Sequence, residues 1–150
     1  MASSWIYLTI AVVIAVVALG VVAITTSIEQ ANKLAEPVID YSSLIDNLHS
    51  TGAIVEPSGE VSQPFFSVKG QVIKVNGDDV QVFEYADSTA ADSEAGLVSP
   101  DSSSIGTSMV HWVATPHFYK SEKLIVLYVG DNMAVIDALE AVLGPQFAGR

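Results

Sequence analysis

The stretch that decides the fold is Val72-Ile-Lys-Val-Asn-Gly-Asp-Asp-Val-Gln-Val-Phe-Glu-Tyr85. Apolar and polar residues alternate on both sides of Asn76-Gly77, which is the pattern of a β-hairpin with a tight turn. We predict a four-residue loop that pairs Val75 with Val80. The side chains expected on the opposite face are Val72, Phe83 and Tyr85. One face of the hairpin should therefore meet helices, and the other should be partly covered or partly wet.

Downstream of the hairpin, we predict a short helix that starts at Asp87 or Ser88 and runs to about Val98. A strand over 109–114 should end before Pro116, and a turn over 120–123 should lead into Leu124–Val129. This last run is the most apolar of the domain, so it should be a central strand.

The last predicted helix begins after Asp131 or Asn132 and stops at Gly144-Pro145. Upstream of the hairpin we predict a helix from Pro37 to about Ser50, capped by Gly52, and a short strand over 53–55. The order β-β-α-β-β-α after this first helix predicts an α+β domain. We expect two layers, an antiparallel sheet with its helices on one face.

Outside this domain, residues 5–24 form an uncharged apolar segment of about twenty residues, long enough to cross a bilayer as one helix. We assign residues 1–25 to a transmembrane anchor, 26–36 to a juxtamembrane stalk and 37–150 to the folded domain. The side chains assigned to the anchor are Trp5, Tyr7, Ile10, Ile14, Val17, Val21 and Ile24. Trp5 and Tyr7 suit the headgroup level at one end of such a helix.

Two questions about this anchor stay open at the sequence level. Val21-Val22-Ala23 would pass as a weak signal-peptidase site, although no Lys or Arg precedes the apolar run, so a retained helix is favoured. The flanks hold too few basic residues for the positive-inside rule to set the orientation. We place the domain outside the cytoplasm because a short N-terminal anchor before one folded domain is the usual plan of an exported protein.

A stripe of apolar residues continues beyond the anchor at spacings of three and four, comprising Ala31, Leu34, Val38, Tyr41, Ile45 and Leu48. Packing of this stripe on its own domain is one interpretation. A homodimer formed through the stalk is the other.

Acidic residues outnumber basic ones by 17 to 6, which gives a net charge of −11. Nucleic acid and anionic lipid headgroups are bound chiefly by Lys and Arg, so nucleic acid is an unexpected partner. No cysteine is present, which rules out both a disulfide framework and a lipid-modified cysteine.

Several segments resemble a group of small bacterial proteins, membrane-anchored or lipoprotein-like, to which no activity is assigned. The segments that carry the resemblance are Val61-Ser-Gln-Pro-Phe-Phe-Ser67, Val72–Tyr85, Val98-Ser-Pro-Asp101, Pro116-His-Phe-Tyr119, Leu124–Gly130 and Leu143-Gly-Pro-Gln-Phe147. The resemblance covers residues 44–149 and implies an extracytoplasmic globular domain, with no catalytic residue to carry over. Many such proteins use a lipid-modified cysteine, so the anchor of this chain must be its helix.

Candidate chemistry is sparse. His111 and His117 could ligate a divalent metal together with carboxylates, but their spacing matches no known ligand motif, so surface or hydrogen-bonded histidines are favoured. His49 suits the C-terminal end of its helix as a cation. Asp131 is expected to cap the last helix rather than leave its N-terminus to a phosphate.

Two further groups of residues have a structural and a functional interpretation. Asp78-Asp79 and the loop from Asp101 could chelate calcium, although solvated turns are favoured because neither has the spacing of a calcium loop. The aromatic residues that could line a ligand groove, but are favoured as core, are Phe65, Phe66, Trp112, Phe118 and Tyr119.

These patterns predict a single-pass membrane protein whose extracytoplasmic domain binds a protein partner in the cell envelope. No cofactor is predicted, and the absence of nucleophile and phosphate-loop motifs argues against an enzyme. The alternatives are a small-ligand-binding domain and a metal-dependent domain.

Overall fold

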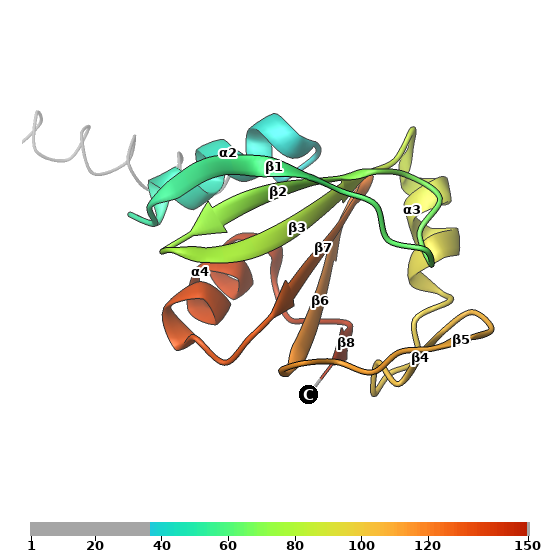
Figure 1. The fold of residues 1–150 in the computed structure, drawn as a ribbon. Helices are drawn as coiled ribbons and strands as arrows, with labels where there is room; N and C mark the ends of the chain where they lie inside the picture. Colours follow the sequence, from blue (N-terminus) through green and yellow to red (C-terminus); the bar gives the residue numbers. More distant parts are fainter. Residues whose placement is uncertain (1–36, 150) are drawn as a thin grey trace, which may run out of the picture. The chain divides into compact units, whose positions relative to one another are not determined.

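The computed structural model describes residues 37–149, and these form one compact unit. They fold as an α+β domain around a six-stranded antiparallel sheet (Figure 1). The strand order is β1-β2-β3-β7-β6-β8. Both the α+β class and the antiparallel sheet predicted from the sequence are thus confirmed.

The helices are α2 (Tyr41–Ser50), α3 (Ser88–Ala95) and α4 (Met133–Leu143). The strands of the main sheet are β1 (Val55–Val61), β2 (Gly70–Val75), β3 (Asp78–Glu84), β6 (Pro116–Ser121), β7 (Leu124–Val129) and β8 (Ala148–Gly149). A small two-stranded ribbon, β4 (Ser104–Ile105) and β5 (Ser108–Met109), lies apart from it.

The hairpin at the centre of the sequence pattern forms, but with a different register. Val75 pairs with Asp78, so the loop is the two-residue turn Asn76-Gly77 rather than a four-residue loop. Both turn residues have positive φ, 51° and 95°, which is the geometry of a type I′ turn and matches the twist of the strands. The shift is by two residues, so the predicted faces are unchanged.

One face of the sheet, which we call the helix face, is covered by α2 and α4. Its buried strand residues are Ile73, Val75, Val80, Val82, Tyr119, Leu124, Val126 and Tyr128. They pack against Leu44 and Leu48 of α2 and against Val135 and Leu139 of α4. For residues 38–48, this confirms that the apolar stripe packs on its own domain. Ala31 and Leu34 lie outside the described residues.

The opposite face, which we call the aromatic face, is covered over β6, β7 and the Phe83–Tyr85 end of β3, so the two-layer expectation is wrong. At the other end of this face the Lys74–Asp79 ion pair is exposed, which confirms the prediction of a partly wet face. Its core holds Phe66, Phe83, Tyr85, Ala91, Val98, Ile105, Phe118, Ile125, Leu127 and Ala148. The cover is α3, the segment between β1 and β2, and the β4–β5 region (Figure 1, right and lower right). The physical reason lies in β7, which is buried on both faces along almost its whole length.

Helix boundaries follow the capping residues. Asp40 and Ser43 form a reciprocal capping box, in which each side chain accepts a hydrogen bond from the backbone N–H of the other. For this reason α2 starts at Tyr41 and not at Pro37. Asp87 caps α3 as predicted, while Asn132 and not Asp131 caps α4.

Two strands differ from the prediction. β1 extends through Pro57 and Gly59, with a register shift between them, because an edge strand tolerates a residue without an N–H. The predicted strand over 109–114 is wrong, since residues 110–115 are irregular and the strand starts at Pro116. Proline is well accommodated as the first residue of a strand.

Candidate functional site

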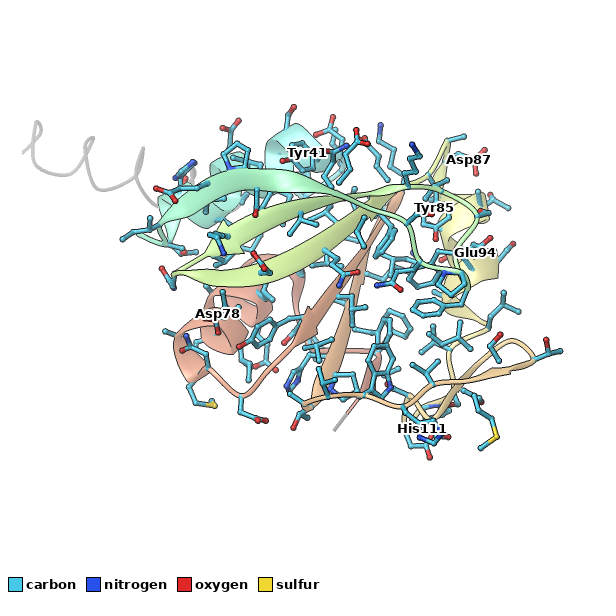
Figure 2. The ribbon with its side chains drawn as sticks, viewed as in Figure 1. Tyr41, Asp78, Tyr85, Asp87, Glu94 and His111 are labelled. Atoms are coloured by element: carbon cyan, nitrogen blue, oxygen red, sulfur yellow. The ribbon has the colours of Figure 1, made fainter. Side chains whose placement is uncertain are left out.

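A hollow of about 440 Å³ lies at the end of the domain that carries the β4–β5 ribbon. Its lining comes from the loop before β4, the irregular segment between β5 and β6, and the residue before the α4 cap. The lining residues are Asp101, Ser103, Val110, His111, Trp112, Ala114, Thr115, Pro116 and Asp131. Figure 2 shows His111 at this end, far from the Asp78 turn. The hollow thus combines two carboxylates, an imidazole and an indole.

The loop that carries Asp101 is held by its own hydrogen bonds. Asp101 Oδ1 accepts from the Ser103 N–H at 3.1 Å, from Ser103 Oγ at 2.8 Å and from Ser99 Oγ at 2.9 Å. The bonds from Ser103 and then Ser99 lower the pKa of Asp101 to about 2. The carboxylate is therefore ionised at any physiological pH.

Trp112 joins this loop to the aromatic face. Its Nε1–H donates to the Ser102 carbonyl at 2.6 Å, and its ring lies edge-on to Phe118 with centroids 5.7 Å apart. Ser102 is fully buried, and its φ of 58° is uncommon for a residue with a side chain. The wall of the hollow is consequently fixed to the core of the domain rather than to a free loop.

Two apolar side chains on the same segment point away from the core. Met109 is 80% exposed and Val113 is 98% exposed, the two largest values among the large apolar residues that the structure describes. Leu97, 48% exposed, precedes Val98, which forms a bridge to Ile105 of the ribbon. Met109 pairs with Ser104, which follows the lining residue Ser103, and Val113 lies between the lining residues Trp112 and Ala114. These exposed apolar side chains thus adjoin the acidic hollow.

The two histidines singled out from the sequence have different surroundings. His111 is exposed and lines the hollow, whereas His117 is buried. Both ring nitrogens of His117 have partners, Gln146 Oε1 at 2.8 Å and the Gly130 carbonyl at 3.1 Å, and the ring stacks on Tyr128. His117 of β6 therefore binds the residues just before β8 and just after β7, and it has a structural role.

Within residues 37–149, no three His, Cys, Asp or Glu side chains are arranged to hold a metal ion. The candidate calcium ligands have protein partners instead. Asp78 accepts a hydrogen bond from the Tyr128 hydroxyl, Asp79 pairs with Lys74, and Asp101 binds its serines. His49 lies in the last turn of α2, where the sequence placed it.

The aromatic candidates divide between core and surface. Phe66, Phe118 and Tyr119 are buried, and Phe65 packs against Phe66 and Trp112, which supports the core interpretation. Trp112 alone both packs on the core and lines the hollow. The sequence does not indicate Asp131 and Thr115 as lining residues, because the pairing of β6 with β7 brings them together and the bonds from Val110 and Trp112 to the Ser102–Ser103 backbone bring the Asp101 loop beside them.

No helix in the described part of the chain is long and apolar enough to cross a membrane. The predicted anchor residues, Trp5 to Ile24, lie outside the described residues, as does the stalk over 26–36. No protein-family model, curated protein or solved structure matches this chain.

Proposed function

We propose that the chain is a single-pass membrane protein whose α+β domain serves as an extracytoplasmic interaction module of a cell-envelope assembly. The tether in this proposal is the apolar segment 5–24, which has the length and composition of a membrane-spanning helix. The contact surface is the end of the domain that carries the hollow.

The observation that carries the proposal is the exposure of Met109 and Val113 on either side of Trp112. Met, Trp and other large apolar side chains are enriched where proteins meet, and a fixed backbone lowers the entropy lost on binding. The Trp112 indole bond to Ser102 supplies that fixed backbone. A polar margin of carboxylates beside such a patch favours one partner over others.

A photo-crosslinking experiment tests the contact surface. Benzoylphenylalanine replaces Val113, whose 98% exposure means that the substitution disturbs no packing. The matched control carries the same group at Ser58 on the exposed edge strand β1. We expect illumination of intact cells to give one adduct of defined mass from position 113 and none from position 58. Equal adduct patterns at both positions would contradict the proposal.

The topology has an independent test, which uses the lack of cysteine in the chain. A Ser58→Cys variant offers a single exposed thiol. A membrane-impermeant maleimide should label it in intact cells to the same extent as in lysed cells. Labelling only after lysis would place the domain in the cytoplasm and overturn the extracytoplasmic assignment.

A further inference from the structure

The charged residues that line the hollow are acidic, so its charge favours a cationic ligand. Asp101 and Asp131 line it, and no Lys or Arg is among its lining residues. Three of the four lysines in the described part of the chain are in ion pairs elsewhere, with Asp79, Asp92 and Glu84. The carboxylates of the hollow therefore have no lysine counter-ion among the described residues.

The remaining features of the hollow suit an extended organic cation. Its volume of about 440 Å³ exceeds what a single metal ion fills, and its Asp and His side chains are not arranged around one point. All three hydrogen bonds to Asp101 converge on Oδ1, which leaves Oδ2 as an acceptor with no partner among the described residues. An indole on the lining adds a surface on which a guanidinium can stack.

We propose that this hollow receives a basic side chain, Arg above all, from an apolar segment of the partner protein. The inference rests on the proposed function, because it names the chemistry by which the partner is recognised. A guanidinium offers a planar fork of N–H donors that matches a carboxylate with two hydrogen bonds and can stack on an indole, whereas an ammonium acts as a compact point charge. The neighbouring apolar residues of the partner segment would meet Met109 and Val113 on the margin.

The test uses the full chain in an uncharged detergent, labelled with 5-fluorotryptophan. The chain has two tryptophans, so a Trp5→Phe variant assigns the fluorine signal of Trp112. The probe is the peptide acetyl-Leu-Arg-Leu-amide, and the matched control replaces Arg by citrulline, which has the same shape and no charge. We expect the Arg peptide to shift the Trp112 signal saturably, with a dissociation constant on the order of millimolar, and citrulline to bind at least threefold more weakly.

Charge variants localise the effect. Asp131→Asn and Asp101→Asn should each weaken binding about threefold, whereas Asp46→Asn, which removes the same charge from the exposed face of α2, should not. Asp131 is exposed and caps no helix, so its variant keeps the fold even if Asp101→Asn loosens the loop. Arg150 directly follows Gly149, whose N–H donates to the Pro100 carbonyl next to Asp101. The Arg150→Gln variant removes this cation as a competitor of the peptide, so it should bind the peptide at least as tightly as the parent chain does.

Three results would overturn the inference. Equal shifts with Arg and citrulline would show apolar recognition alone, and a shift produced by calcium chloride that the peptide cannot displace would show a metal site. No shift with any probe would remove the cation site altogether. In each case a specific adduct at position 113 would still support the proposed function, so the two failures are distinguishable.

Discussion

Both faces of the sheet carry a buried core, but the two cores are covered in different ways. The helix face packs against α2 and α4, whose apolar residues repeat at helical spacing. The aromatic face packs against only one short helix, α3, and otherwise against irregular segments that contribute Phe65, Phe66 and Trp112. A hollow of about 330 Å³ also lies between the end of α2, the Asn76 turn and α4, but Asp137 is the single charged residue of its lining. We place the candidate site on the irregular side because the hollow there combines two carboxylates with an imidazole and an indole.

Each face combines paired polar groups with buried hydroxyls that have no partner among the described residues, namely Tyr119 on the helix face and Tyr85 and Ser102 on the aromatic side. On the helix face, the Tyr128 hydroxyl donates to Asp78 and accepts from the Asn132 N–H, while the Tyr119 hydroxyl is buried with no partner among the described residues. On the aromatic side, the Trp112 indole and the Asp101 carboxylate hold the loop backbone. The difference that remains is the cover itself, so we expect the helix face to contribute to stability alone and the irregular cover, which holds the hollow, to contribute to binding as well. The following predictions test that division.

The largest effect is expected from Leu139→Ala, which removes a fully buried side chain of α4 from the helix face. Truncation of a buried leucine loses its transfer free energy and leaves a cavity, so the free energy of unfolding should fall by about 3 kcal/mol. Urea unfolding measures this loss. The control Met133→Ala, on a side chain that is 61% exposed, should change it by less than about 0.5 kcal/mol. Peptide binding below the transition should stay unchanged.

A smaller loss is expected from Trp112→Phe, which keeps an aromatic ring near Phe118 and removes the bond to the Ser102 carbonyl. The loss of one hydrogen bond should cost about 1 kcal/mol, with faster amide hydrogen exchange in residues 99–104. Trp5→Phe is the matched change outside the domain and should leave that exchange unaltered. If Trp112→Phe lowered the free energy of unfolding as much as Leu139→Ala does, the wall of the hollow would contribute to stability as much as the helix face does. That result would contradict the proposed difference between the two faces.

The helices and central strands could be predicted from the sequence, whereas the irregular cover of the aromatic face could not. Helix starts at Asp87 and near Asn132, the hairpin at Asn76-Gly77 and the central β7 all follow from local rules on caps, turns and apolar runs. These rules act over a few residues, so they need no knowledge of the tertiary structure. Their errors are also local, such as the hairpin register and the start of α2.

The aromatic face and the hollow depend instead on contacts between distant residues. Asp131 reaches the lining through the pairing of β6 with β7, and the Asp101 loop reaches it through the Trp112 bond to a carbonyl ten residues away. No periodic pattern marks such irregular segments. The cover on the aromatic face could have been predicted from the continuous apolar run Leu124–Val129. A strand that is apolar at every position requires cover on both faces.

Two tyrosines of the helix face should respond to the same change with opposite sign. Tyr119→Phe removes a buried hydroxyl without a partner among the described residues and should raise the free energy of unfolding by about 1 kcal/mol. Tyr128→Phe removes a hydroxyl with two partners and should lower it by a similar amount. Urea unfolding at pH 7 compares them, and a loss in both variants would contradict the assignment of Tyr119.

The pH dependence of the Tyr119 variant provides a second measurement. Burial, and then the charges of Glu140 and Asp137, raise the pKa of Tyr119 to about 12, above the ordinary value of 10.0. The unfolded tyrosine ionises first, so this group has no effect on the pH dependence below pH 10, and the free energy of unfolding falls as the pH rises from 10 through 12. Unfolding curves between these pH values should therefore fall less steeply for Tyr119→Phe than for the parent chain.

The smallest expected effect concerns Asp101 at the hollow. Its pKa of about 2 depends first on the Ser103 N–H and then on the Ser103 hydroxyl, so Ser103→Ala removes one bond and should raise the pKa toward 3.8. Because the folded pKa is depressed, the stabilising contribution of this group is present above pH 3.8 and disappears as the pH falls through 2. A titration of the aspartate carboxyl carbons by NMR measures the shift, with Ser108→Ala, on the exposed ribbon, as control. An unchanged Asp101 pKa would mean that the Ser103 N–H and the Ser99 hydroxyl suffice to stabilise the carboxylate, and the Ser103 hydroxyl would then contribute nothing to the charge of the hollow.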